Sequence, residues 1–250
     1  MICRTFADVC RSFAFIGDIG YDAVRKTFGM VTRLKCVLFD FDMTLADSSY
    51  AITDSLNMIA ESRGLRRVSR QEVLGVIGLP IAESWVALWG AFDESWLEEY
   101  RRMFVSKEYD GLRLFPGTKV VLESLRERGI MLGVASNRRN AMPALQATGI
   151  ADLFDSVVGL QDVAMPKPSP DVLLRSMEFL GVDRAETWYV GDTCDDMRSA
   201  VAAGVRGIGV ESGNFRKVDL LEVGAWRTIP SVADLPTLPE AGFPTFHVEG

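Results

Sequence analysis

The chain has 250 residues, of which 48% are hydrophobic and 24% are charged, and its formal net charge at pH 7 is −7. These values are typical of a globular protein and allow one core domain with a sizeable insertion, or two small domains. A general nucleic-acid binder normally carries a basic surplus, and an anionic membrane attracts basic surfaces. The acidic balance therefore argues against nucleic acid and membrane as partners.

The cysteines and the histidine restrict the kinds of site that the chain can hold. No two cysteines form a CxxC pair, so a zinc cluster is not expected. A Ser-His-Asp triad would depend on a single histidine near the C-terminus, His247. Widely spaced cysteines without a secretory signal favour a reducing, cytoplasmic location.

The N-terminal stretch, residues 1–33, is interpreted as an extension. Its apolar run Cys10–Ile19 is too short to span a membrane, and Asp8 and Asp18 make it a poor signal peptide. A packed helix and a loosely attached segment are both open interpretations, as is a true start at Met30.

The first strand is expected at Cys36–Phe41, where the sequence CVLFDF is almost continuously apolar. A short apolar run of this kind is typical of a strand that is buried on both faces of a parallel sheet. Two acidic residues, Asp40 and Asp42, stand at its carboxyl end.

Residues 48–112 interrupt the strand pattern, since they show helical periodicity and no convincing strand. The segment Ser49–Arg63 is amphipathic and stops at Gly64, a common C-terminal signal. Two short helices flank the turn Gly78-Leu79-Pro80, and a later helix carries an apolar stripe that we expect to form core. The three helices are Gln71–Val76, Ile81–Trp89 and Ser95–Lys107, and the stripe is Trp96, Leu97, Tyr100, Met103 and Phe104. The pattern predicts a helical bundle inserted after the first strand.

After residue 112, apolar runs alternate with helical patterns. The expected strands are Ile130–Ala135, Ser156–Gly159, Thr187–Gly191 and Val205–Val210, and the expected helices are Thr118–Arg128, Pro170–Leu180 and Met197–Ala203. Strands that alternate with helices form βαβ units. The predicted fold class is therefore α/β, a doubly wound parallel sheet with an inserted helical bundle.

The motif DxDxT at the end of the first strand is the strongest local signal. In a doubly wound sheet, ligands bind at the carboxyl ends of the strands. Asp40 and Asp42 are spaced i, i+2 and can face the same crevice, with Thr44 beside them. Taken alone, the motif could equally consist of loop and helix-cap aspartates.

Three further polar groups follow the next expected strands in chain order. They are Ser136-Asn137, Lys167-Pro168, and Gly191-Asp192 with Asp196. Each has a bland alternative as a turn residue, a solvated charge or a helix cap. Their order along the chain, each after a strand, favours a single shared site.

These motifs make the chain resemble the haloacid dehalogenase superfamily, in the branch of phosphoglycolate phosphatase and β-phosphoglucomutase. Asp40–Leu45 resembles the first family motif, although Met43 stands where glycine is commonest. Ser136-Asn137, Lys167-Pro168 and Gly191–Asp196 resemble the second, third and fourth motifs. The resemblance covers residues 34–235.

The resemblance implies a division of the chain into domains. Residues 34–47 and 113–235 are expected to form a Rossmann-like catalytic core, and residues 48–112 a helical cap over the site. Residues 236–250 are expected to form a C-terminal tail.

The resemblance also implies a magnesium-dependent phosphatase that acts through an aspartyl phosphate. Asp40 is the expected nucleophile and Asp42 the general acid and base. The metal is expected at the carboxylates of Asp40 and Asp192 and the backbone carbonyl of Asp42, with Asp196 as a ligand or support. The phosphoryl group is expected at Thr44, Ser136, Asn137 and Lys167, with Lys167 also catalytic, and substrate discrimination at Gly78, Leu79 and Pro80.

The expected partner is a small phosphorylated metabolite, with 2-phosphoglycolate as the best single candidate. A sugar phosphomutase of the β-phosphoglucomutase type is the first alternative, because it uses the same core. The complete pair Asp40 and Asp42 argues against a dehalogenase, and Asp42 against a phosphonate hydrolase. An alternative of another class is a non-catalytic binding protein that has kept the fold.

Overall fold

The structure, a computed structural model, describes residues 33–239. From Leu34 onward these residues belong to one compact unit. The expected N-terminal extension, most of the expected tail and His247 lie outside the described residues. None of the helices in the described part has the length and apolar character needed to span a bilayer.

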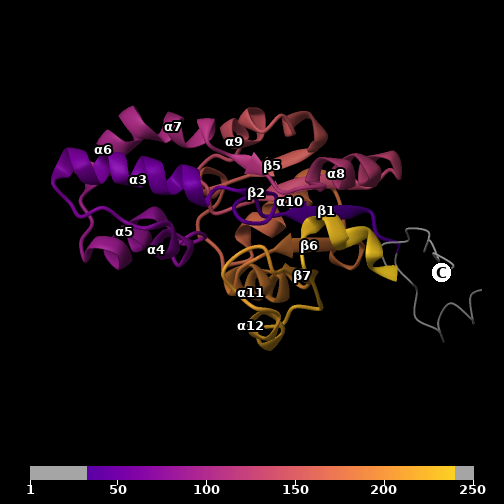
Figure 1. Ribbon diagram of the computed structural model, residues 1–250. Coiled ribbons are helices and arrows are strands. Elements are labelled where there is room, and N and C mark those ends of the chain that lie inside the picture. Colours follow the sequence, from indigo (N-terminus) through magenta and orange to yellow (C-terminus); the bar gives the residue numbers. More distant parts are fainter. Residues whose placement is uncertain (1–32, 240–250) are drawn as a thin grey trace, which may run out of the picture. The chain divides into compact units, whose positions relative to one another are not determined.

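A parallel sheet with strand order β5-β4-β1-β6-β7-β8 forms the centre of the fold (Figure 1). Its strands are β1 Cys36–Phe39, β4 Met131–Ala135, β5 Ser156–Val158, β6 Thr187–Gly191, β7 Arg206–Val210 and β8 Arg227–Ile229. The expected α/β fold is confirmed, and each expected strand is present with small differences at its ends. Strand β8 was not predicted.

Helices cover both faces of the sheet. Successive residues of a strand point to opposite faces, so Val37 and Phe39 pack in one apolar cluster and Leu38 in another. Helices α8 Thr118–Glu127 and α9 Met142–Ala147 contribute to the first cluster, and helices α10 Asp171–Leu180 and α11 Cys194–Ala203 to the second. The segments around the sheet also include helix α12 Lys217–Glu222 and the short 3-10 turns Ala151–Leu153, Leu160–Asp162, Arg184–Glu186 and Val232–Thr237.

A two-stranded antiparallel ribbon joins the sheet to the inserted helices. The chain leaves through β2 Ala46–Asp47 and returns through β3 Arg113–Leu114. Between them lie α3 Ser49–Arg63, α4 Arg70–Leu74, α5 Ile81–Trp89, α6 Glu94–Glu99, the π-helical turn η1 Tyr100–Phe104 and α7 Val105–Asp110. Figure 1 shows these helices gathered beyond one end of the sheet.

The helix expected at Ser95–Lys107 is present, but a π-helical turn divides it. The structure has α6, the π-helical turn and α7 in succession. Leu97 and Tyr100 are buried as expected, but half of Met103 is exposed. A π-helical turn contains an extra residue, so it shifts the positions after Tyr100 relative to the buried stripe.

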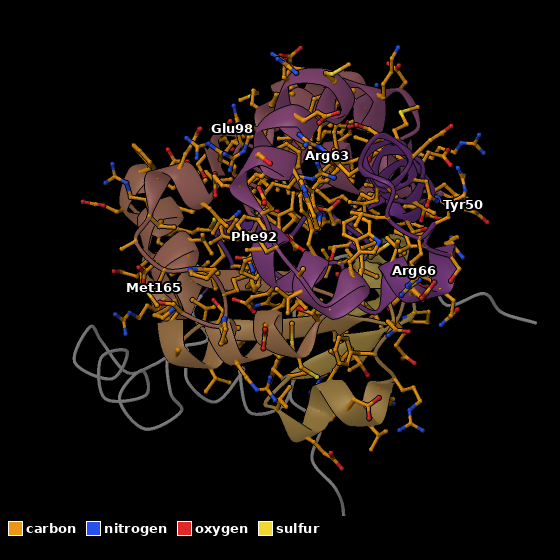
Figure 2. The ribbon with its side chains drawn as sticks, turned by 90° about the vertical axis from the view of Figure 1, so that its left-hand side faces the viewer. Tyr50, Arg63, Arg66, Phe92, Glu98 and Met165 are labelled. Carbon is orange, nitrogen blue, oxygen red and sulfur yellow. The ribbon has the colours of Figure 1, made fainter. Side chains whose placement is uncertain are left out.

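Trp85 forms the centre of the inserted bundle. Its buried ring lies 5.5 Å from that of Trp89, 6.0 Å from that of Phe92 and 5.8 Å from that of Tyr100. In Figure 2, which looks onto these helices, Phe92 lies near the middle of the view. The aromatic residues of the bundle therefore pack mainly against one another.

Candidate active site

The predicted polar groups meet at the carboxyl edge of the sheet. Asp40 follows β1, Ser136 follows β4 and Asp192 follows β6, and these three strands are neighbours. The backbone N–H of Asp40 donates to the carbonyl of Val190 at 2.9 Å, which continues the ladder to the strand end. Parallel neighbours end at the same edge, so residues far apart in sequence lie together there.

A tight turn after β1 places Asp40 and Asp42 in one cavity wall. In this turn, the backbone N–H of Met43 donates a hydrogen bond to the Ala46 carbonyl at 2.8 Å, and that of Leu45 donates one to the Phe41 carbonyl at 3.0 Å. Met43 has a φ of 56°, in the left-handed region that favours glycine. The preference of the family for glycine at this position therefore has a conformational reason.

Lys167 is the buried cation of the site. Its Nζ lies 3.0 Å from Asp40 Oδ1 and donates hydrogen bonds to Asp196 Oδ1 at 2.6 Å and to the Tyr189 hydroxyl at 3.0 Å. The contact between Lys167 Nζ and Asp40 Oδ1 is an ion pair, and Asp40 Oδ1 has no hydrogen-bond partner among the described residues. Lys167 thus neutralises Asp40 while leaving that oxygen able to react or to bind a cation.

Asp40, Asp192 and Asp196 form a buried carboxylate cluster. Each offers one oxygen, and these oxygens lie within 4.8 Å of one another. The Thr44 hydroxyl donates to Asp192 Oδ1 at 2.8 Å. A Cβ at Gly213 would lie 2.0 Å from Asp192 Oδ2, so only glycine leaves room for this oxygen.

Asp196 is the most fully bonded member of the cluster. Its Oδ1 accepts from Lys167 and lies 2.8 Å from the Tyr189 hydroxyl, while Oδ2 accepts from the Thr193 N–H at 2.9 Å and the Thr193 hydroxyl at 2.7 Å. The carboxylate oxygens of Asp40 and Asp192 accept fewer hydrogen bonds than those of Asp196. The donor set therefore fits a hard divalent cation held by Asp40 and Asp192, with Asp196 orienting Lys167.

The electrostatics of the cluster agree with this fit. Burial raises the pKa of Asp40 to about 6, against a smaller opposing effect of Lys167. Burial, with Asp196 and Asp40 nearby, raises the pKa of Asp192 well above its usual value. Burial also acts to raise the pKa of Asp196, but Lys167 and hydrogen bonds outweigh it and the pKa is lowered. The cluster holds more negative charge than Lys167 neutralises, and a bound cation would supply the balance.

Asp42 is held apart from this cluster by Arg138. The guanidinium donates from Nε to Asp42 Oδ2 at 2.8 Å and from Nη2 to Oδ1 at 2.6 Å. Both side chains are largely buried, and both residues line the cavity. Arg138 also lies over the Phe41 ring, at 5.3 Å from its centroid.

Ser136 and Asn137 occupy different parts of the site. Ser136 is buried and lines the cavity, and its hydroxyl accepts a hydrogen bond from the Arg138 N–H at 3.2 Å. Asn137 Oδ1 accepts from the Lys167 N–H at 2.9 Å, and Asn137 Nδ2 donates to the Gly78 carbonyl at 2.8 Å. The Asn137 side chain therefore connects the lysine loop to the loop of the inserted bundle.

Residues from the inserted bundle complete the cavity, which has a volume of about 520 Å³. Gly78, Leu79 and Pro80 are among its lining residues. Every core residue predicted for the site is thus found at the same edge of the sheet. Thr44, which was expected at the phosphoryl group, donates its hydroxyl hydrogen to Asp192 in this structure.

Two residues of the site were not predicted. Arg138 directly follows Ser136-Asn137, but nothing in the sequence links it to Asp42, which lies 96 positions away. Tyr189 belongs to an expected apolar strand, and its hydroxyl contacts Lys167, Asp196 and the Ala135 carbonyl. The hydroxyl of a tyrosine inside a buried strand needs a hydrogen-bond partner. This requirement was the feature of the sequence that could have indicated Tyr189 as a residue of the site.

The chain is similar in sequence to known hydrolases and phosphatases. A family model described as haloacid dehalogenase-like hydrolase matches residues 37–210. A probable phosphatase, IndB, of Dickeya dadantii is 33% identical over 187 residues, covering 71% of this chain and 81% of the relative. A phosphoglycolate phosphatase of Rhodospirillum rubrum is 30% identical over 215 residues, covering 80% and 89%.

A solved structure shows the same fold. The crystal structure of a predicted phosphoglycolate phosphatase from Haemophilus somnus is 25% identical and superposes with a TM-score of 0.74, covering 84% of this chain and all of the other. The family match spans Asp40, Ser136, Lys167 and Asp192. The chain belongs to the haloacid dehalogenase-like hydrolase family.

Proposed function

We propose that this chain is a magnesium-dependent phosphatase that hydrolyses a phosphomonoester through an aspartyl phosphate on Asp40. The observation that carries the proposal is the position of the Asp40 carboxylate. It ends β1, lines the cavity, and lies 3.0 Å from a buried lysine and within 4.8 Å of two further carboxylates. Such a group can attack phosphorus only when nearby cations screen the negative charge of the substrate.

Each step of the reaction can be assigned to a side chain. A carboxylate oxygen of Asp40 attacks phosphorus as the ester P–O bond breaks, and protonated Asp42 gives its proton to the departing oxygen. Asp42 then accepts a proton from the water that attacks the aspartyl phosphate, which releases inorganic phosphate and restores Asp40. Magnesium, held by Asp40, Asp192 and the Asp42 carbonyl, would neutralise phosphoryl charge and fix its orientation.

The other residues bind or support the phosphoryl group. Ser136, the Asn137 backbone N–H and Lys167 would donate to phosphoryl oxygens, and Lys167 would stabilise charge in the transition state. Thr44 would serve indirectly, by orienting Asp192. Residues 48–112 would act as the cap of a core formed by residues 34–47 and 113–235, with Gly78-Leu79-Pro80 as its specificity loop.

The names of the relatives support 2-phosphoglycolate as the first physiological candidate to assay. The decisive test of the chemistry uses p-nitrophenyl phosphate with and without magnesium. Rapid acid quenching followed by intact-mass spectrometry should detect one added phosphoryl group, and peptide mapping should place it on Asp40. Asp40→Asn should show neither turnover nor the adduct. Turnover without magnesium, or an adduct that persists in Asp40→Asn, would rule out the proposed mechanism.

A further inference from the structure

The cavity above Asp40 is far larger than a phosphoryl group and a two-carbon acid require. Its volume is about 520 Å³, and cavities of roughly 300–1,000 Å³ enclose drug-sized ligands. Asp40, Asp42 and Ser136 form part of its wall. The cavity therefore continues directly from the reacting group into the inserted bundle.

This volume exists with the bundle loop already seated on the core. The Gly78 carbonyl accepts a hydrogen bond from Asn137 Nδ2 at 2.8 Å. A Cβ added to Gly78 would lie only 3.1 Å from Thr193 Cγ2. The loop has little room to move closer at this point, so the size of the cavity is not produced by a detached loop.

The wall contributed by the bundle is predominantly apolar. Its aliphatic side chains and its tryptophan are Ile52, Leu56, Val76, Ile77, Leu79, Ile81, Leu97 and Trp85, and Pro80, Ala82, Tyr100 and Tyr109 also line it. Ser84 also lines the cavity, but its hydroxyl lies 3.2 Å from the Val76 and Pro80 carbonyls and is thereby engaged. This wall suits an apolar group, and its Trp85 Nε1 is a buried donor without a hydrogen-bond partner among the described residues.

The cations of the cavity are poorly placed to bind a second anion next to the phosphate. Arg138 donates two short hydrogen bonds to Asp42. Arg101, the charged lining residue among the described bundle residues, is 45% exposed in its side chain and lies 3.8 Å from Glu94. Arg139 is exposed. A carboxylate one carbon from the ester would therefore face a mainly apolar wall, and the described bundle residues offer it no buried cation.

We infer that the preferred substrate is the phosphomonoester of an apolar alcohol, whose aliphatic group fills the bundle side of the cavity. The inference rests on the proposed phosphatase function and names its substrate class. The phosphoryl group lies at Asp40, and the apolar group packs against Leu56, Ile77, Leu79 and Ile81. Burial of this group supplies the discrimination that the polar core residues do not.

The test uses a series of ethyl, n-butyl and n-hexyl phosphates. Their leaving alcohols differ little in acidity, so the chemical step is nearly constant and kcat/KM reports packing. With magnesium, kcat/KM should rise about fourfold per added methylene, and n-hexyl phosphate should exceed 2-phosphoglycolate by about 100-fold. A matched series of n-alkylphosphonates, whose carbon–phosphorus bond stays intact, tests the cavity by calorimetry. Their affinity should rise in the same order with a negative heat-capacity change.

A pair of variants tests the location of the apolar group. Leu79 lines the cavity and is 37% exposed, whereas Val86 of helix α5 is 50% exposed and is not a lining residue. Leu79→Ser should lower kcat/KM for n-hexyl phosphate about tenfold and lower it by a much smaller factor for ethyl phosphate. Val86→Ser should leave both unchanged. An equal loss for both esters in Leu79→Ser would overturn the assignment of this wall.

The outcomes separate this inference from the phosphatase proposal. A flat series with active enzyme, or higher kcat/KM for 2-phosphoglycolate, would overturn the substrate class and leave the phosphatase function standing. No hydrolysis of any ester, with phosphonate affinity that rises with chain length, would overturn the phosphatase function and support the apolar site. Absence of both turnover and chain-length dependence would overturn both.

Discussion

Arg138 holds Asp42 through two parallel hydrogen bonds, of 2.8 and 2.6 Å, inside the cavity that also contains Asp40. A bidentate pair with arginine fixes the plane of a carboxylate as well as its position. In this arrangement Asp42 accepts two hydrogens and has none to give, which matches the step that activates water. To protonate a leaving group, Asp42 has to carry a proton and leave Arg138.

Arg138→Met should therefore disturb Asp42 specifically. We expect kcat to fall by roughly 10- to 100-fold, with partial recovery in Arg138→Lys, because lysine offers a point charge in place of a planar fork. The informative measurement is a double-mutant cycle. In an Asp42→Asn background, Arg138→Met should cost little more. Fully additive losses would show that Arg138 acts independently of Asp42.

Asp42→Asn should slow turnover by roughly two to four orders of magnitude, the usual range for general acid–base catalysis. The loss should be smaller for p-nitrophenyl phosphate than for an alkyl phosphate, since p-nitrophenolate departs without a proton. Steady-state kcat for both substrates, measured on the same preparation, checks this. The same loss for good and poor leaving groups would indicate a structural role for Asp42.

Asp40→Asn should affect stability in a way that depends on pH. Burial raises the pKa of Asp40 to about 6, so the folded protein binds more protons than the unfolded chain between about pH 4 and pH 6. The metal-free protein consequently loses stability as the pH rises through that range, by an amount on the order of 1–3 kcal/mol. Without metal, Asp40→Asn should melt above the wild type near about pH 7.5, and the difference should shrink near about pH 4.5. Calorimetry in the presence of a chelator measures it, and a difference independent of pH would contradict the assignment.

Magnesium should raise the melting temperature of the wild type, because a ligand that binds only the folded state stabilises it. The shift should disappear in Asp192→Asn. Asp195→Asn is the matched control, since Asp195 pairs with Arg198 at 2.8 Å and lies outside the carboxylate cluster. A magnesium shift that survives in Asp192→Asn would move the metal site elsewhere. Calcium should restore little activity, given its looser coordination.

Gly78→Val should lower kcat/KM for n-hexyl phosphate more than for ethyl phosphate. Gly78 has a φ of 97°, and an added Cβ would lie 3.1 Å from Thr193 Cγ2, so the substitution should displace the loop from the core. Gly90→Val is the control, because Gly90 has a φ of 76° but no described atom within 4 Å of the Cβ position. Equal changes in kcat/KM for the two substrates, at unchanged melting temperature, would exclude the loop as a specificity element.

The sequence alone was sufficient for five strands of the sheet, without β8, and for the residues at its carboxyl edge. The apolar runs that became β1, β4 and β6 are short and nearly continuous, and such runs are stable only when buried on both faces. Parallel strands that are buried in this way end at a common edge, so Asp40, Ser136 and Asp192 had to converge. That prediction rested on the residue types that follow the strands and on the rule that neighbouring parallel strands end at the same edge of a sheet.

The tertiary structure decided what surrounds those residues. Whether the Arg138 side chain reaches Asp42, how the π-helical turn rotates Met103 outward, and how much space remains above Asp40 are all outcomes of packing between distant segments. The periodicity of the sequence does not predict these features, because each of them depends on how several loops and helices pack against one another. The chemistry of the reacting edge is therefore local in the sequence, whereas the shape of the cavity that selects a substrate exists only in the folded chain.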